Sequence, residues 1–171
     1  MQNNKNNYYK NQIVENNQEH LSKTLNIPTQ HVKKTNQFFG DIYFDTPKIS
    51  FFTDASVKNN TIIAGYGITD NTILVSFKKQ IATNNNNLAE LIAVKEAIHI
   101  AKMMELDSLE IFTDCLPVIE HIKRFYNLQK TSEIFLPTLK EISDELTLFK
   151  AKRISWVARH RNVFADQLAQ E

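Results

Sequence analysis

Four acidic residues stand where the texture of the sequence changes: Asp54, Glu90, Asp114 and Asp166. Asp54 and Asp114 each follow a short apolar run that ends in Thr-Asp, whereas Glu90 and Asp166 lie in stretches of helical texture. Carboxylates brought close together repel one another, and each is costly to bury without a partner. A divalent cation removes that cost, and hard oxygen ligands of this kind suit Mg²⁺ or Mn²⁺. Two such ions about 4 Å apart can activate a water molecule and stabilise the leaving oxygen of a phosphodiester.

The apolar pattern predicts the strands that would position two of these acids. Three runs rich in Ile, Val, Phe and Thr predict antiparallel strands at 49–56, 61–70 and 71–82. A tight polar turn at Asp70-Asn71 joins the second run to the third. The shorter runs LEIFTD and RISWVAR predict a fourth and a fifth strand. Asp54 would then end the first strand, and Asp114 would end the fourth.

Helical texture occupies four further stretches, 84–104, 116–126, about 133–149 and 162–171. Asparagines can cap the first helix, and Pro117 falls in the first turn of the second, where a missing N–H costs little. The order β-β-β-α-β-α-α-β-α predicts an α/β fold, a five-stranded mixed sheet with helices on both faces. If strands one and four are neighbours, Asp54 and Asp114 lie side by side. Glu90 would reach them from the first turn of the first helix, and Asp166 lies in the closing helix.

Composition indicates one domain in a reducing compartment. The 171 residues, 42% of them hydrophobic, suffice for one domain with a core but not for two full domains. The formal charge of +1 neither requires nor excludes a nucleic-acid partner. The single cysteine, Cys115, cannot form an internal disulfide, and the first residues lack the order of a signal peptide. No apolar run approaches the roughly 20 residues that cross a bilayer, so we expect a soluble, cytoplasmic protein.

Residues 1–46 differ in texture from the remainder. Residues 1–18 are rich in Asn and Gln, a composition that buries too little surface to fold alone, and we expect a disordered tail. Residues 19–46 have apolar positions that fit two short helices around Pro28. The stretch is compatible with a helix-turn-helix or with a two-helix appendage, and the lack of an obvious third helix favours the appendage. The folded domain is expected over 47–171.

Four motifs carry the four acids in chain order: TDAS at 53–56, NNLAEL at 86–91, FTDC at 112–115 and WVARHRNVFADQLA at 156–169. With the predicted element order, they resemble the ribonuclease H family, in its shorter-loop bacterial, archaeal and plant-type branch. The resemblance implies that residues 47–171 hydrolyse the RNA strand of an RNA/DNA hybrid by a two-metal-ion mechanism. It implies Asp54, Glu90, Asp114 and Asp166 as the catalytic, metal-binding acids and Mg²⁺ or Mn²⁺ as the ions. The implied partner is the hybrid, and we expect a monomer without protein or membrane partners.

The resemblance extends to residues that would contact the nucleic acid, which are Ser56, Asn86, Asn87, Arg159, Arg161 and Asn162. The pair Asn86-Asn87 would contribute to recognition of the ribose 2′-hydroxyl, because an amide both donates and accepts hydrogen bonds. Helix capping is the alternative role for one of these asparagines. Arg159 and Arg161 close a basic segment, 150–161, that would offset the repulsion between phosphates and acids. An ordinary solvated face is the alternative.

Three further residues have side chains that could take part in catalysis, base stacking or redox chemistry. His160 lies six residues before Asp166, where its imidazole could act as general acid or proton shuttle, or contact a phosphate from solvent. Trp156, in the fifth predicted strand, is expected in the core rather than as a platform for base stacking. Cys115 is expected to be a small packing residue without a redox role.

Departures from the family pattern leave rival functions open. Ala55 stands where many relatives have glycine after the first acid, and residues 127–133 contain no basic handle. A non-catalytic nucleic-acid-binding module on the same fold would bind a hybrid without cutting it. A resolvase-like or transposase-like nuclease of the same superfold would cut duplex DNA that contains no RNA. The presence of all four acids argues against the first rival, and the Asn pair with the Trp-Val-x-Arg segment argues against the second.

Overall fold

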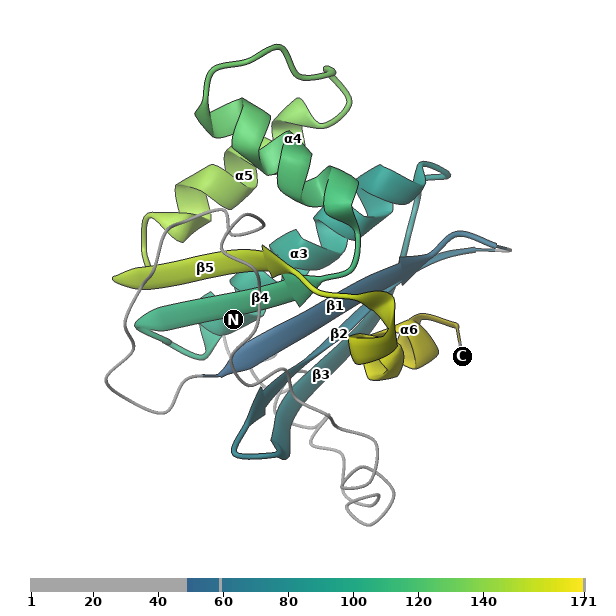
Figure 1. Ribbon diagram of the computed structural model, residues 1–171, viewed down its shortest axis with the longest axis vertical. Coiled ribbons are helices and arrows are strands. Elements are labelled where there is room, and N and C mark those ends of the chain that lie inside the picture. Colours follow the sequence, from purple (N-terminus) through teal and green to yellow (C-terminus); the bar gives the residue numbers. More distant parts are fainter. Residues whose placement is uncertain (1–48, 59, 171) are drawn as a thin grey trace, which may run out of the picture.

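The computed structural model describes residues 49–58 and 60–170, which form a mixed sheet with helices on both of its faces (Figure 1). The strands are β1 (Ser50–Ser56), β2 (Thr61–Thr69), β3 (Thr72–Ile81), β4 (Ser108–Thr113) and β5 (Ala151–Trp156). The helices are α3 (Asn86–Met103), α4 (Leu116–Tyr126), α5 (Leu136–Leu146), the short 3₁₀ helix η2 (Arg159–Arg161) and α6 (Val163–Gln170). The tail and extension expected over 1–46 lie outside the described residues.

The five strands follow the order β3-β2-β1-β4-β5. β1 pairs antiparallel with β2 and parallel with β4, and β4 pairs parallel with β5. The predicted fold class and order of elements are therefore confirmed. The predicted tight turn is also present, because Asp70 and Asn71 both have positive φ, 48° and 63°, the left-handed conformation of two-residue hairpin turns.

Successive side chains of β1 point to opposite faces of the sheet and enter two separate cores. Phe51 lies in the larger core, beneath α3, α4 and α5, whereas Phe52 lies in the smaller core, beneath α6. The Phe52 ring stacks on Tyr66 and Phe112, with centroids 5.2 and 4.9 Å apart. Because both of its faces are buried, β1 holds any side chain at its end in a fixed position.

Helix α3 is apolar on most sides because the sheet covers one side and α4 and α5 cover another (Figure 1). Its fully buried residues include Leu91, Val94 and Ile98. Asn85 precedes the helix and caps it, its Oδ1 accepting from the Leu88 N–H at 2.9 Å. Truncating a buried leucine such as Leu91 to alanine would cost about 2–5 kcal/mol, so α3 is firmly fixed on the sheet.

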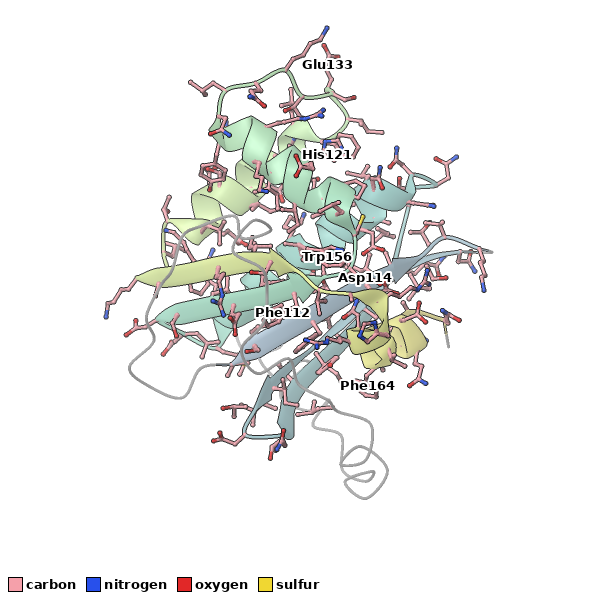
Figure 2. The ribbon with its side chains drawn as sticks, in the orientation of Figure 1. Phe112, Asp114, His121, Glu133, Trp156 and Phe164 are labelled. Carbon is pink, nitrogen blue, oxygen red and sulfur yellow. The ribbon has the colours of Figure 1, made fainter. Side chains whose placement is uncertain are left out.

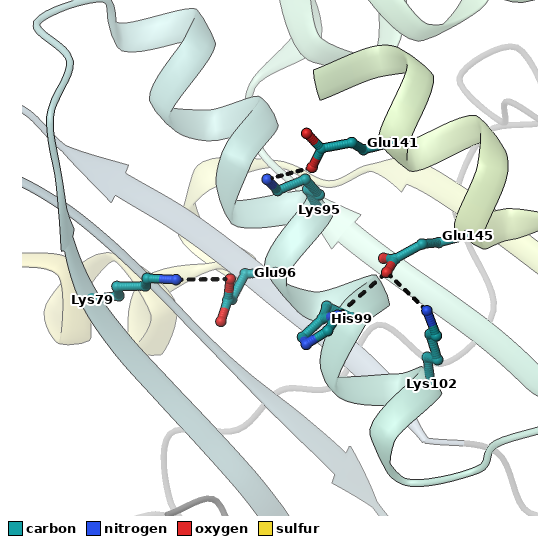
Figure 3. Close-up of polar contacts among 7 residues, drawn as sticks. All are labelled: Lys79, Lys95, Glu96, His99, Lys102, Glu141 and Glu145. Atoms are coloured by element: carbon teal, nitrogen blue, oxygen red, sulfur yellow. Dashed lines mark hydrogen bonds and ion pairs between the residues drawn. The ribbon is translucent and has the colours of Figure 1, made fainter. Parts of the chain in front are cut away.

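The outer side of α3 carries a row of ion pairs to β3 and α5, which we call the charged seam (Figure 3). It consists of Lys79, Lys95, Glu96, His99, Lys102, Glu141 and Glu145. Lys95 Nζ lies 2.7 Å from Glu141 Oε2, and Lys79 Nζ lies 3.5 Å from the buried Glu96. Each carboxylate of the seam faces a basic side chain, so the seam connects three elements through paired groups.

The predicted bounds differ most from the observed ones in two elements, α5 and β5. Helix α5 is shorter than the predicted 133–149, because Pro137 lacks an N–H and stands in the first turn of the helix. Strand β5 lies earlier than the predicted 153–159, because its pairing with β4 ends at Trp156. Within the described ranges, no helix combines the length and the apolar character needed to cross a membrane.

Candidate functional site

Two acids meet where β1 and β4 stop pairing with each other. The last pair of these parallel strands is Thr53 with Thr113, so Asp54 and Asp114 are the first residues beyond it. Neighbouring strands lie about 4.8 Å apart, which sets the two carboxylates beside each other. The sequence predicted that Asp54 ends the first strand, but β1 continues along β2 to Ser56. Asp54 is instead the first residue of β1 beyond its pairing with β4. Figure 2 shows Asp114 at the end of β4, on the side where α6 lies.

Glu90 reaches the same place from α3. It is the fifth residue of the helix rather than a first-turn residue as predicted, because Asn85 is the cap and the helix begins at Asn86. One carboxylate oxygen each of Asp54, Glu90 and Asp114 lie within 4.8 Å of one another. Asp54 is 5% exposed, and the buried Glu90 Oε2 finds no hydrogen-bond partner among the described residues. These residues form what we call the three-acid cluster.

Burial and mutual repulsion make the three-acid cluster costly to ionise. Burial, followed by the charges of Asp114 and Asp166, raises the pKa of Asp54 to about 7. Burial, followed by the charges of Asp54 and Asp114, raises the pKa of Glu90 to about 9. Burial also raises the pKa of Asp114. Near neutral pH the cluster therefore retains protons that a bound cation would displace.

The residues of the cluster fit a divalent cation of the hard type. All of their donor atoms are carboxylate oxygens, the ligands that Mg²⁺ and Mn²⁺ prefer. A cation would give the buried Glu90 Oε2 the partner that the described residues do not supply. Its charge would also oppose the repulsion that raises the pKa values of the cluster.

The fourth predicted acid, Asp166, lies on α6 outside the three-acid cluster. Its Oδ1 accepts a hydrogen bond from Arg159 Nη2 at 2.8 Å, and its Oδ2 accepts one from Gln170 Nε2 at 2.7 Å. Asp166 is nevertheless close enough for its charge to raise the pKa values of Asp54 and Asp114. The structure thus brings Asp166 to the border of the cluster with both of its oxygens engaged by other side chains.

Asn162 does not fit its predicted role as a nucleic-acid contact, because it is 0% exposed. Its Nδ2 donates to the Thr53 carbonyl at 2.9 Å and to Asp114 Oδ1 at 3.4 Å. The bond to Asp114 favours the ionised carboxylate and lowers the pKa of that group, against the effect of burial. Asn162 therefore ties the segment before α6 to the ends of β1 and β4. Its predicted place at the start of the closing helix, 162–171, gave no sign of this burial.

The other predicted substrate residues remain at the surface near the cluster. Asn86 is exposed and Asn87 is half-buried. Because Asn85 caps α3, neither of these two asparagines is the helix cap. Ser56 is half-buried at the end of β1, two residues beyond Asp54. Asn87 Oδ1 lies 3.8 Å from the Sγ of Cys115, the residue after Asp114.

The basic segment predicted at 150–161 is divided between two ends of β5. Lys150 and Arg153 pair with acids near the start of β4, and Lys152 donates to the Leu146 carbonyl at the end of α5. These three cations serve contacts within the fold, at the end of β5 away from the acids. Arg159 of η2 adjoins the cluster, since its charge lowers the pKa values of Asp54 and Asp114 against the effect of burial. Arg161 lies two residues further along η2, and both arginines are exposed.

Three side chains near the site complete its description. Trp156 packs against the larger core as predicted, and its Nε1 donates to the Asp114 carbonyl at 3.0 Å, a contact that the sequence did not suggest. Cys115 also packs against that core, and burial raises its pKa to about 12, in line with a packing role. His160 is exposed in η2, and its side chain makes no hydrogen bond or ion pair to the described residues.

The chain matches one protein-family model and is similar in fold to several solved structures. The family model described as RNase H matches residues 46–171, whereas comparison with curated proteins gives no match. RNase H1 from the halophilic archaeon Halobacterium salinarum is 23% identical, with a TM-score of 0.63 over 72% of this chain and 95% of that chain. The N-terminal RNase H domain of a Mycobacterium tuberculosis protein is 21% identical, with a TM-score of 0.65 over 73% and 92%. LC11-RNase H1, solved in complex with an RNA/DNA hybrid, is 19% identical, with a TM-score of 0.60 over 71% and 93%.

Proposed function

The chain belongs to the RNase H family, and on this premise we propose that it hydrolyses the RNA strand of RNA/DNA hybrids with divalent cations. The observation that carries the proposal is the three-acid cluster, whose carboxylate oxygens lie within 4.8 Å of one another. A domain that only binds nucleic acid gains nothing from buried acids that repel one another, whereas a metal-dependent nuclease requires them. We assign the activity to residues 47–171.

The proposed division of labour follows from the elements that hold the acids. When bound, two divalent cations supply the charge that activates a water molecule and stabilises the leaving oxygen of the phosphodiester. Asp54, Glu90 and Asp114 would hold this charge at a fixed place, since β1, α3 and β4 are packed on both sides. Asp166 would add the fourth carboxylate from α6. Burial strengthens these electrostatic interactions because it excludes water from between the groups.

The surface around the cluster supplies candidates for substrate contact. We propose that Asn86 and Asn87 contact the ribose and base edges, because they lie one turn before Glu90 on α3 and do not cap the helix. Ser56 would contact the backbone beside Asp54. The exposed arginines of η2, Arg159 and Arg161, would approach phosphates, and His160 between them is a candidate for phosphate contact or for exchanging protons with solvent.

A cleavage assay tests this function. Labelled RNA/DNA hybrid, double-stranded RNA and duplex DNA are each incubated with Mg²⁺, Mn²⁺ or a chelator, using wild type, Asp54→Asn and Asp107→Asn. Asp107 is the matched control, since its exposed carboxylate pairs with Lys150 away from the cluster. We expect metal-dependent cleavage of the hybrid by wild type and Asp107→Asn, and loss of cleavage in a folded Asp54→Asn. A hybrid that is bound but uncut with either ion would identify a binding module, and cleavage of duplex DNA would indicate the resolvase-like alternative.

A further inference from the structure

Asp166 differs from the other three acids in having a donor on each of its oxygens. Arg159 Nη2 lies 2.8 Å from Oδ1, and Gln170 Nε2 lies 2.7 Å from Oδ2. Asp166 is one of the described residues, yet its oxygens are not part of the group that lies within 4.8 Å. Each donor uses one of the two lone pairs on its oxygen, so a cation that takes Asp166 as a ligand meets a carboxylate whose orientation these two donors fix.

The hydrogen bond from Gln170 bears on where the Asp166 carboxylate lies relative to the three-acid cluster. Asn162, immediately before α6, contacts Asp114, so the N-terminal end of α6 is the end that adjoins the three-acid cluster. Side chains in a helix normally lean toward its N-terminus, which would carry Asp166 toward the cluster. Gln170 stands one turn further toward the C-terminus of the same helix. By the same tendency the Gln170 side chain leans back toward Asp166, and its hydrogen bond fixes the orientation of a carboxylate whose oxygens lie outside the group that lies within 4.8 Å.

We propose that Gln170 is a positioning residue that holds Asp166 back from the three-acid cluster and so sets the cation concentration at which all four acids act together. The inference rests on the proposed function, because it assigns Asp166 as a ligand. Gln170 is neutral, whereas the second donor, Arg159, is a cation beside the acids. Removing the Gln170 donor therefore changes the position of Asp166 without changing the charge of the site.

An ordinary surface pair is the competing explanation, since Gln and Asp one turn apart often bond on exposed helices. Such a pair would stabilise α6 slightly and leave the affinity for cations unchanged. Asp166 is not a remote surface acid, however, because its side chain is 22% exposed and its charge acts on Asp54 and Asp114. The two explanations therefore predict different metal titrations.

The test compares Gln170→Met with Gln167→Met. Methionine keeps the length and the helix preference of glutamine but has no N–H to donate. Gln167 is exposed on the same helix and lies next to Asp166, which makes it a matched control. Two measurements are made with Mn²⁺: its apparent affinity for the free protein, followed by the fluorescence of Trp156, and the concentration for half-maximal cleavage of hybrid. Trp156 is a suitable reporter because it is the single tryptophan and bonds to the Asp114 carbonyl.

We expect Gln170→Met to raise the Mn²⁺ affinity and lower the half-maximal concentration by about three- to tenfold, the effect of losing one exposed charge-assisted hydrogen bond. Gln167→Met should match wild type in both measurements. Unchanged or weakened affinity in Gln170→Met, or equal shifts in the two variants, would overturn the inference. If wild type shows no Mn²⁺ binding that Asp54→Asn abolishes, the proposed function itself fails, and this outcome is distinct from a failure of Gln170 alone.

Discussion

Helix α3 carries two glutamates in opposite settings, Glu90 at the three-acid cluster and Glu96 at the charged seam. Glu96, in the seam, faces Lys79 at 3.5 Å, and it is 7% exposed. Glu90, one and a half turns earlier, faces Asp54 and Asp114, and its buried Oε2 lacks a described partner. The negative charge of Glu96 is thus compensated by Lys79, whereas the charge of Glu90 on the same helix has no such compensation. Uncompensated burial lowers stability, so its presence points to a ligand that supplies the missing charge.

Exchanging each glutamate for glutamine gives the strongest contrast between the two settings. Glu90→Gln should reduce cleavage of hybrid on the order of a thousandfold, about 4 kcal/mol in the barrier, because a carboxylate ligand is lost at the reacting centre. Glu96→Gln should cleave at the wild-type rate and lose about 1 kcal/mol of unfolding free energy, since a charged partner of Lys79 is replaced by a neutral one. Initial rates and urea unfolding measure the two effects. Equal losses of rate in both variants would remove the distinction between cluster and seam.

The pH dependence of stability in a chelator sharpens the same contrast. The folded-state pKa of Asp54 is raised to about 7 and that of Glu90 to about 9, above their ordinary values in the unfolded chain. The folded protein therefore binds more protons than the unfolded chain through this range, and the free energy of unfolding falls as pH rises from about 5 to 9. One pKa unit corresponds to about 1.4 kcal/mol, so the two pKa shifts together set an upper bound on the order of 10 kcal/mol for this fall.

Urea unfolding at pH 5 and pH 8 measures this fall. Mg²⁺ should restore most of the stability at pH 8, and Asp54→Asn should reduce the slope because its amide does not ionise. Glu96→Gln serves as the control and should keep the wild-type slope. A free energy of unfolding that stays level or rises from pH 5 to pH 8 would contradict the inference that the charges of the three-acid cluster are uncompensated.

Substitutions of Asn162 and Asn86 should distinguish a residue that supports the cluster from a residue at the surface beside it. Asn162→Ala removes a buried donor to Thr53 and Asp114, so it should cost about 1–3 kcal/mol of unfolding free energy and lower kcat with little change in KM. Asn86→Ala alters an exposed side chain and should raise KM while leaving stability within about 0.5 kcal/mol. Steady-state kinetics on hybrid, with thermal unfolding of both variants, checks the difference. A pure KM effect in Asn162→Ala would return that residue to the role of substrate contact.

The smallest effect is expected within the charged seam itself. Glu141→Gln breaks the pair with Lys95, in which the Glu141 side chain is 58% exposed. Exposed pairs contribute about 0.2–1 kcal/mol, and the loss should shrink as salt is added. Thermal unfolding at low and high salt measures it, with cleavage rates unchanged. A change in cleavage rate would mean that α5 is coupled to the cluster through α3.

The framework of the fold could be predicted because it depends on local patterns. Apolar alternation located the strands, and the change to helical spacing located α3 and α4. The rules that govern mixed sheets allowed, without requiring, the pairing of β1 with β4 that sets Asp54 beside Asp114. The ends of the elements were harder to predict from the sequence. The end of β5, for example, depends on where β4 stops, and β4 lies far away in the sequence.

Details of the site depend on side-chain contacts that no local pattern encodes. Asn162 was predicted as a nucleic-acid contact at the start of the closing helix, but it is buried where β1, β4 and α6 converge. The basic segment looked continuous, yet Lys152 contacts the end of α5 because it lies in the first half of β5, whereas η2 follows the end of that strand. Gln170 was overlooked, although its spacing of one turn from Asp166 on a predicted helix could have suggested the contact.

The bond from Asn162 to the Thr53 carbonyl has a consequence for how the domain folds. It joins residues that are 109 positions apart, and the acids it supports come from four separate segments of the chain. Contacts of such long range form late, because their loop-closure entropy must be overcome before they stabilise anything. Early folding intermediates would therefore contain the β1–β2–β3 hairpins and α3 without an assembled set of acids. Cleavage activity would then appear only with the final cooperative step of folding, which makes it a sensitive measure of the fully native state.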